Sequence, residues 1–213
     1  MTGLVRFEID GVRHYHTPGG DFPSVTAILW ATQPASKKKS LEAWRDNMGE
    51  APADRIRDEA ARRGTRLHSM IEEQLGPNPP PEPDCPYWRC VRPLVKHIES
   101  VFGLELPVWN VEVGYAGTLD CLAMLDGHVT VLDWKGSTKP KREEWIEDYC
   151  LQAAAYVKAP KEPEASRAVI AVIVRGKPVQ EFKLSSREIV RYWGLFRRRV
   201  DEFMVMQELL KRR

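Results

Sequence analysis

Two aspartates and a lysine in the middle of the chain have residue types and a spacing suited to a divalent cation. Asp120 ends the segment Gly-Thr-Leu-Asp, and Asp133 and Lys135 lie on either side of a tryptophan in the next such segment. Both segments have β-strand character, and the Asp126-Gly127 dipeptide between them is typical of a tight hairpin turn. A hairpin centred on that turn places Asp120 opposite Asp133, because residues equally far from the turn pair across it.

The chemistry expected of this arrangement is metal binding next to a positive charge. Two carboxylates held close together repel each other, and a divalent cation removes that repulsion. Carboxylate and carbonyl oxygens suit Mg²⁺ or Mn²⁺, and the backbone carbonyl of Trp134 is a further candidate ligand. Alternate strand residues share a face, so Lys135 is predicted to lie beside Asp133 while the Trp134 side chain points away. Lys135 would position or deprotonate water, or neutralise charge on a phosphate.

Further features accompany the acidic pair. Gln152 and Tyr156 are four residues apart on a predicted helix and therefore lie on one face of it. His68 is a candidate imidazole ligand, which would favour Mn²⁺ over Mg²⁺. Basic residues suited to phosphate contacts follow the second strand directly: Lys139, Lys141 and Arg142.

Each of these features has an ordinary structural interpretation when taken alone. An Asp-x-Lys triplet is short and common, a buried tyrosine often has a polar neighbour, and a lone histidine is usually structural or solvated. The run Arg197-Arg198-Arg199 is interpreted as a solvated helix face, because consecutive residues point in different directions and acids follow. The interpretation as a site therefore depends on all the features together.

Length and composition set limits on the class of protein. The chain has 213 residues, enough for one domain with a substantial core. Thirty-two basic against 30 acidic residues leave a net charge of +2, so a preference for a polyanion must come from local charge. The longest apolar run, 168–174, suits a buried strand and is too short to span a bilayer.

The N-terminal residues and the cysteines indicate a cytoplasmic protein. Residues 1–10 contain acids and no apolar segment, and so resemble neither a secretory signal nor a transit peptide. The four cysteines match no common zinc or iron–sulfur spacing, and a disulfide framework is not expected. We expect a protein of the cytoplasm, bacterial or from a phage in its host.

The elements that must position these residues alternate between helices and strands. We expect a hairpin over 4–16, a helix capped by Ser24, a polar connection at 37–39, helices over 41–48, 53–75 and 88–102, strands over 108–113, 117–125 and 128–135, a helix over 143–158, strands over 168–174 and 179–184, and a long helix over 186–211 with a capping box. This order predicts an α/β domain with a central mixed sheet flanked by helices. We expect one domain over 1–213, with its core at 60–185, the N-terminal hairpin and helices over 1–59, and the C-terminal helix over 186–213.

In their order along the chain, the motifs resemble those of the PD-(D/E)XK nuclease superfamily, in its RecB-like branch. That branch has a histidine in a GT-x-x-H-like context, a GT-x-D strand, a (D/E)-x-K strand and Q-x-x-x-Y on the next helix. The corresponding segments here are Gly64–His68, Gly117–Asp120, Asp133–Lys135 and Gln152–Tyr156. Through residues 22–26 and 114–120, the resemblance is strongest to the group of mitochondrial genome maintenance exonucleases and their phage and bacterial relatives.

The resemblance implies a restriction-endonuclease-like core and a DNA exonuclease that depends on Mg²⁺ or Mn²⁺ and prefers single strands with free ends. It implies that Asp120, Asp133 and the Trp134 carbonyl hold the metal, with His68 as an additional ligand. Lys135 would be the catalytic lysine, and two residues would orient it or the DNA backbone: Gln152 and Tyr156.

Three further features lie outside these motifs. Glu112 is a weaker acidic candidate, because several nucleases of this type place an acid near that position. Gly136 stands where the group often has threonine, and we expect this to alter loop flexibility or a phosphate contact. Four tryptophans are candidate stacking platforms for unpaired bases, although core packing is the commoner role: Trp30, Trp44, Trp88 and Trp109.

Other functions are compatible with the same residues. A structure-specific or duplex DNA endonuclease would share the site and differ only in how substrate reaches it. A non-catalytic nucleic-acid-binding module would keep the fold alone, although the intact Asp120, Asp133 and Lys135 set argues against it. The sequence leaves the oligomeric state open.

Overall fold

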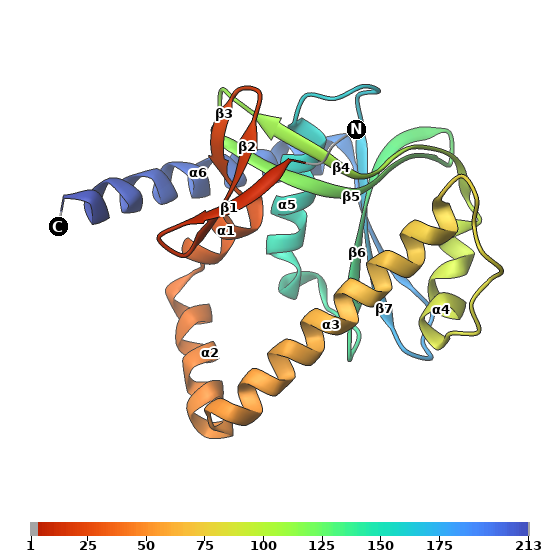
Figure 1. Cartoon of the computed structure of the whole chain (residues 1–213), viewed down its shortest axis with the longest axis horizontal. Helices are drawn as coiled ribbons and strands as arrows, with labels where there is room; N and C mark the ends of the chain where they lie inside the picture. The colour runs from red at the N-terminus through yellow and green to blue at the C-terminus, as the bar shows by residue number, and fades with distance from the viewer. Residues whose placement is uncertain (1–3, 213) are drawn as a thin grey trace.

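A five-stranded sheet is the framework of the fold (Figure 1). In a computed structural model that describes residues 4–212, the strand order is β4-β5-β6-β7-β8. The strands are β4 (Ile98–Asn110), β5 (Tyr115–Leu125), β6 (His128–Ser137), β7 (Arg167–Val174) and β8 (Gln180–Leu184). β6 and β7 are parallel and the other neighbours are antiparallel, so the predicted mixed central sheet is confirmed.

The hairpin of β5 and β6 has the predicted register. Asp126 and Gly127 both have positive φ angles, 49° and 72°, as a tight two-residue turn requires. Cys121 lies opposite Leu132, and the pairing of β5 with β6 ends there. Beyond that point β5 pairs with β4 and forms one isolated bridge, from Ala116 to Ser24, while β6 pairs only with β7. The next residue of each strand, Asp120 or Asp133, therefore lies where the two strands separate.

Helices cover both faces of the sheet (Figure 1). On one face, α1 (Val25–Ala31), α5 (Glu147–Lys158) and α6 (Ser186–Lys211) share a core with Val131 of β6. On the other face, α3 (Glu50–Leu75) and α4 (Pro86–Val95) pack with Leu132 and Trp134. The side chain of Trp134 thus points away from the face that carries Asp133, as strand alternation predicted.

The N-terminal segment forms a small sheet of its own. β1 (Val5–Ile9) and β2 (Val12–Thr17) form the predicted hairpin, and β3 (Gly20–Pro23), which was not predicted, pairs with β2. The side chain of Ser24 accepts a hydrogen bond of 3.0 Å from the backbone nitrogen of Ala27, which confirms the predicted cap of α1.

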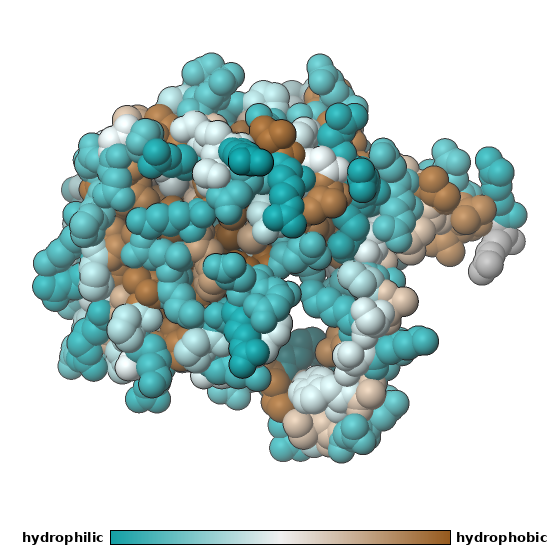
Figure 2. All heavy atoms as spheres, turned by 180° about the vertical axis from the view of Figure 1, so that it is seen from behind, coloured by the Kyte–Doolittle hydropathy of each residue, from teal (hydrophilic) through white to brown (hydrophobic). Residues whose placement is uncertain are grey.

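Two helices project from this body (Figure 1). α2 (Ala35–Met48) and α3 meet at Gly49, whose φ of 86° allows the sharp change of direction. α2 has no buried residue among its fourteen, and in the first half of α3 only Ala53 is buried. Seen from behind, a hollow separates this projection from the body (Figure 2).

Several predicted boundaries are wrong. The strand expected over 108–113 is the end of β4, and residues 111–114 form the turn to β5. The polar connection at 37–39 belongs to α2, because lysine and alanine are good helix formers even on an exposed helix. The predicted helix over 88–102 ends at Val95, and β4 begins at Ile98, where β-branched and aromatic residues favour a strand. The helix over 143–158 begins as a 3₁₀ turn, η1 (Glu143–Trp145), before α5.

The C-terminal helix forms as predicted. The side chain of Ser185 caps α6 and Glu188 bonds back to the cap, which completes the predicted capping box. Among residues 4–212, no helix combines the length and the apolar character that crossing a membrane requires.

Candidate active site

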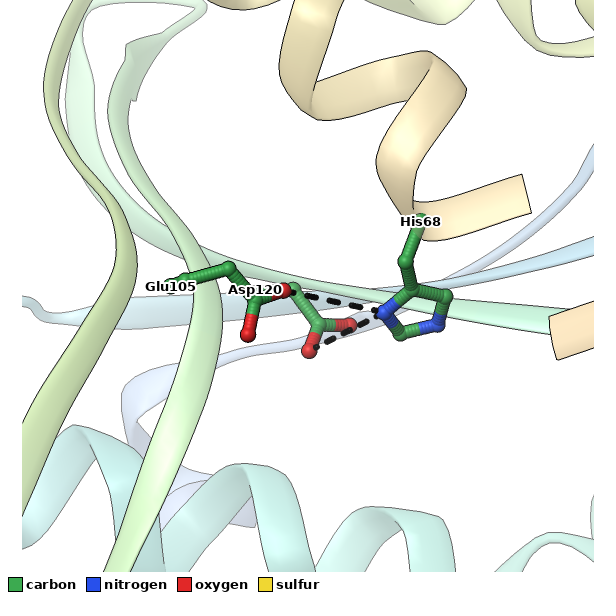
Figure 3. Close-up of side chains that lie close together, drawn as sticks. All are labelled: His68, Glu105 and Asp120. Carbon is green, nitrogen blue, oxygen red and sulfur yellow. Dashed lines mark ion pairs between the residues drawn. The ribbon is translucent and has the colours of Figure 1, made fainter. Parts of the chain in front are cut away.

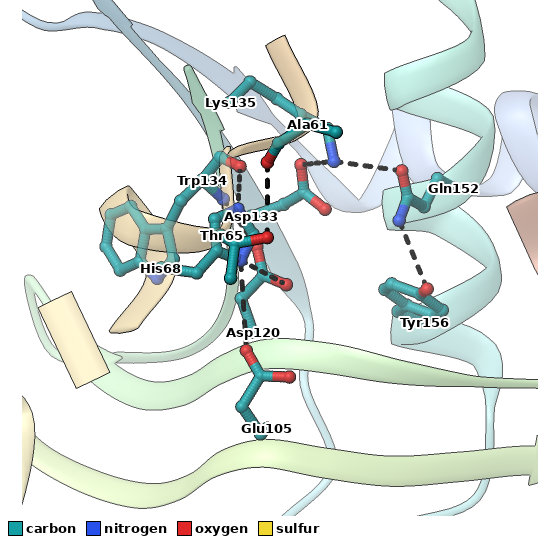
Figure 4. A network of polar contacts seen from close by, with 10 residues as sticks. All are labelled: Ala61, Thr65, His68, Glu105, Asp120, Asp133, Trp134, Lys135, Gln152 and Tyr156. Atoms are coloured by element: carbon teal, nitrogen blue, oxygen red, sulfur yellow. Dashed lines mark hydrogen bonds and ion pairs between the residues drawn. The ribbon is translucent and has the colours of Figure 1, made fainter. Parts of the chain in front are cut away.

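The candidate site lies where β5 and β6 separate (Figure 4). Oδ2 of Asp120 accepts a hydrogen bond of 2.7 Å from the backbone nitrogen of Trp134. The β5–β6 pairing ends before Trp134, so its backbone N–H has no carbonyl partner on β5, and the side chain of Asp120 takes that place. This hydrogen bond also fixes the Asp120 carboxylate at the start of the Asp-Trp-Lys segment.

A chain of polar contacts runs from β6 to α5 (Figure 4). Nζ of Lys135 lies 2.6 Å from Oδ2 of Asp133 and donates a hydrogen bond of 3.1 Å to Oε1 of Gln152. Nε2 of Gln152 in turn donates to the hydroxyl oxygen of Tyr156 at 3.2 Å. The structure therefore brings these four predicted residues together, and the helical spacing of Gln152 and Tyr156 aligns them with the lysine.

The carboxylate of Asp133 is the most deeply buried charged group of the site. Only 1% of Asp133 is exposed, and neither carboxylate oxygen has a hydrogen-bond partner of ordinary geometry among the described residues. The ammonium group of Lys135 balances the negative charge of Asp133, but the remaining lone pairs of the carboxylate have no donor within residues 4–212. Buried polar atoms in this state call for a further partner, and a cation would supply one.

A second group of side chains meets Asp120 from the other side (Figure 3). Nδ1 of His68, on α3, lies 3.6 Å from Oδ1 of Asp120 and 3.9 Å from Oε1 of Glu105, on β4. One ligand atom from each of the three residues lies within 4.8 Å of the others. The other ring nitrogen, Nε2, is 2.7 Å from the carbonyl oxygen of Trp134. Nε2 can therefore donate to the carbonyl while Nδ1 faces the carboxylates.

Glu105 was not predicted to belong to the site. Leu104 pairs with Cys121 and Leu106 with Leu119, so Glu105 lies opposite Asp120 between these two pairs. Its φ of 45° is a strained value for a residue other than glycine. The sequence signal is a charged residue between two leucines in a strand.

Several weaker candidates lie elsewhere. Glu112 is exposed in the turn between β4 and β5 and is outside the cluster. Trp88, a residue of α4, is only 3% exposed and cannot stack on a base, whereas Trp30 is 63% exposed and Trp44 is 36% exposed. Gly136 lies within β6 rather than in a loop, and a Cβ atom there would meet the side chain of Leu67 at 3.3 Å.

The burial of the site changes the proton affinities of its members. Burial lowers the pKa of His68, but Glu105, Asp120 and the Trp134 carbonyl outweigh it and raise the pKa to about 9. Burial and the negative charge of Asp133 raise the pKa of Asp120 to about 7. Burial lowers the pKa of Lys135, but the two aspartates outweigh it and raise the pKa above its usual value. Lys135 is therefore an ammonium group at neutral pH.

The glycine that begins the Gly-Thr-Leu-Asp motif makes room for α5. A Cβ atom on Gly117 would lie 2.7 Å from a ring carbon of Tyr156 and 3.0 Å from its hydroxyl oxygen. Tyr156 is 3% exposed and has little space to retreat. Only glycine lets this tyrosine approach β5 closely, and the approach places its hydroxyl beside Gln152.

The donor set fits a divalent cation that prefers oxygen ligands. The carboxylates of Asp120 and Glu105 and a ring nitrogen of His68 form one group of potential ligand atoms, and Asp133, whose negative charge acts on Asp120, lies outside that group. The unsatisfied oxygens of Asp133 and the mutual repulsion around Asp120 both favour an added positive charge. Such a mixture of oxygen atoms with one nitrogen suits Mg²⁺ or Mn²⁺.

The fold and the site together define a mixed α/β protein with a candidate metal centre at a fork in its central sheet. No protein-family model matches the chain. The chain is similar to mitochondrial genome maintenance exonuclease 1 of Mus musculus, with 29% identity over 206 residues, covering 88% of this chain and 60% of that protein. The protein of the same name from Xenopus tropicalis is 28% identical over 211 residues, covering 91% of this chain and 60% of that protein. The Homo sapiens protein of that name is 28% identical over 200 residues, covering 85% of this chain and 58% of that protein. This chain thus spans about three fifths of the length of these curated relatives.

Proposed function

We propose that this protein is a divalent-metal-dependent nuclease that hydrolyses phosphodiester bonds in DNA, as an exonuclease on single strands with free ends. The observation that carries the proposal is the buried Asp133–Lys135 pair beside Asp120 at the fork of the sheet. Two acids and a lysine in this arrangement combine metal ligation with a fixed positive charge for a phosphate. The similarity to proteins named as exonucleases supports the nuclease part of the proposal.

Asp120 and Asp133 would hold the metal, together with the carbonyl oxygen of Trp134 and with His68 as an additional ligand. The Trp134 carbonyl has two lone pairs, so it can accept from Nε2 of His68 and still face the ion. Glu105 joins this set because its carboxylate lies beside Nδ1 of His68. A bound cation would act as a Lewis acid and lower the pKa of a water molecule.

The other residues of the site would orient charge around the phosphate. Lys135 keeps its proton at neutral pH, so its ammonium group would neutralise charge that develops on the phosphate oxygens. Oε1 of Gln152 accepts a hydrogen bond from the ammonium group of Lys135. This bond fixes the directions of the other N–H groups of Lys135. The hydroxyl of Tyr156 holds the amide of Gln152 and fixes this orientation from within the core.

The preference for single strands with ends is supported by the position of the α2–α3 projection. Leu67 anchors the second half of α3 in the core that includes Trp134. At the other end, an ion pair between Lys37 of α2 and Asp148 of α5 ties the projection to the opposite face. A strand that reaches the site beneath this projection would enter by an end, and a closed circle would be excluded.

Digestion of labelled DNA in four forms tests the proposal. Linear and circular molecules, each single-stranded and duplex, are incubated with Mg²⁺, Mn²⁺ or EDTA. We expect loss of linear single strands with either metal, intact circles, and no reaction in EDTA or with Asp133→Ala. The variant Lys96→Ala changes an exposed lysine at the end of α4 and serves as the control that retains activity. Cut circles would indicate an endonuclease instead, and absence of cleavage by folded wild-type protein would overturn the proposal.

A further inference from the structure

The loop that leaves β6 carries an exposed tryptophan within a group of cations. Trp145 is 49% exposed, and the side chains of Lys139 and Arg142 lie 5.6 Å and 5.3 Å from the centre of its ring. We propose that this loop is a subsite for single-stranded nucleic acid, in which Trp145 stacks on a base next to the cleaved position. The inference rests on the proposed function and adds to it a binding element and a positioning residue, Gln180.

The loop starts close to the candidate catalytic lysine. Asp133, Lys135 and Ser137 are alternate residues of β6 and share one face of the sheet. Ser137 is about 7 Å beyond Lys135 along the strand, a distance comparable with one nucleotide step of an extended chain. A strand whose phosphate lies at Lys135 would therefore pass its next nucleotide over the loop.

Hydrogen bonds hold the loop in one conformation. Oγ of Ser137 donates to the carbonyl oxygen of Lys139 at 2.7 Å. The side chain of Gln180, on β8, accepts from the backbone nitrogen of Lys141 at 2.8 Å and donates to its carbonyl oxygen at 3.1 Å. Gln180 thus binds both backbone groups of one loop residue. A surface that is ordered before binding loses less conformational entropy when a flexible strand binds.

The charges of the loop lack acidic partners. Lys139, Lys141 and Arg142 form no ion pair with an acid within residues 4–212, although Glu143 and Glu144 follow them in the chain. Burial lowers the pKa of Lys141, and the positive charges of Lys139 and of Lys37 on α2 lower it further. Cations that repel one another in this way favour a polyanion, because phosphates relieve the repulsion.

An exposed indole among unpaired cations is the combination that binds single strands. Bases stack on aromatic rings without regard to sequence, while the cations contact the phosphates on either side. With Lys139 and Arg142 over its ring, Trp145 is still 49% exposed. A duplex keeps its bases stacked internally and offers none to this ring. The loop therefore favours unpaired DNA.

Binding and steady-state measurements test the subsite. The affinity of an oligothymidylate is measured by fluorescence anisotropy in EDTA, where cleavage does not interfere. Trp145→Ala should weaken binding about tenfold, and Trp145→Phe should restore most of the affinity because it keeps a ring. With metal present, the loss in Trp145→Ala should fall on KM rather than on kcat. Arg175→Ala, an exposed cation in the β7–β8 turn, is the matched control.

Gln180→Met tests the positioning role, since it keeps the length of the side chain and removes both hydrogen bonds to Lys141. We expect a rise in KM similar to that of Trp145→Ala with an unchanged melting temperature. Removing one loop cation should reduce the slope of log affinity against log salt concentration by about 1, the value expected for one lost phosphate contact. Equal oligothymidylate affinities for wild type and Trp145→Ala would overturn the subsite even if cleavage is observed. Weakened binding without any cleavage would preserve the subsite and overturn the proposed function.

Discussion

Oδ2 of Asp120 accepts a hydrogen bond of 2.7 Å from the backbone nitrogen of Trp134, at the point where β5 and β6 stop pairing. This contact closes the fork that the separating strands leave open. It holds the carboxylate of Asp120 beside the carbonyl group of the same tryptophan, which His68 contacts from α3. One side chain thus stabilises the local backbone and presents a free oxygen, Oδ1, toward the candidate metal centre.

Asp120→Asn separates these two roles. The amide oxygen can still accept from Trp134, but the negative charge that repels Asp133 is gone. We expect the metal-free variant to unfold at the same temperature as wild type or higher at pH 8, and to lose the stabilisation that Mn²⁺ gives wild type. Thermal unfolding with and without Mn²⁺ measures both effects. A variant that gains as much stability from Mn²⁺ as wild type would exclude Asp120 as a ligand.

Metal affinity should rise with pH. The pKa of Asp120 is raised to about 7 and that of His68 to about 9, so both groups bind protons more readily than their free side chains. A metal must displace these protons. For each proton displaced, the metal affinity should therefore fall about tenfold when the pH is lowered by one unit. Titration calorimetry at pH 7.5 in buffers of different ionisation enthalpy measures the protons released on Mn²⁺ binding. Heats that do not depend on the buffer would contradict this prediction.

Glu105→Gln tests the acid that joins the cluster from β4. Loss of this carboxylate should weaken Mn²⁺ binding about tenfold and lower the pKa of His68, because one of its negative neighbours is removed. Glu112→Gln is the matched control, since Glu112 is exposed in the following turn and outside the cluster. Calorimetry gives the affinity, and an NMR titration of the His68 ring gives the pKa. Equal Mn²⁺ affinities for the two variants would remove Glu105 from the site.

Gly117→Ala should disturb the site through packing alone. The new Cβ atom would lie 2.7 Å from the ring of buried Tyr156, which must shift and carry Gln152 with it. We expect a loss of about 1–3 kcal/mol in the free energy of unfolding, typical of overpacking, together with reduced cleavage. Urea unfolding measures the first effect.

Gly64→Ala provides the contrast, since a Cβ atom there has open space inside α3. Alanine in a helix interior should stabilise the protein by about 0.5–1 kcal/mol. If both glycine variants were equally stable, the close approach of Tyr156 to β5 would not be a constraint.

Local patterns predicted much of the site. The turn at Asp126-Gly127 determined the hairpin register, and strand alternation separated Asp133 and Lys135 from Trp134. The helical spacing of Gln152 and Tyr156 correctly placed both on the face toward Lys135. These relations depend on a few neighbouring residues and on fixed periodicities, so they can be recognised without knowledge of the tertiary structure.

The features that the sequence did not predict depend on contacts between segments far apart in the chain. Glu105 belongs to the site because the β4–β5 register places it opposite Asp120, and that strand was in part predicted as a helix. In the proposed subsite around Trp145, Gln180 of β8 binds the backbone of Lys141. No periodicity in the sequence encodes either relationship.

The central claim is that the Asp133–Lys135 pair is catalytic, and one rate comparison tests it most directly. Single-turnover release of nucleotides from linear single-stranded DNA is measured with Mn²⁺ for wild type and for Asp133→Asn and Lys135→Met, after circular dichroism shows that both variants are folded. The account predicts a decrease of about 10³-fold or more in each variant. Rates within tenfold of wild type in either folded variant would contradict it.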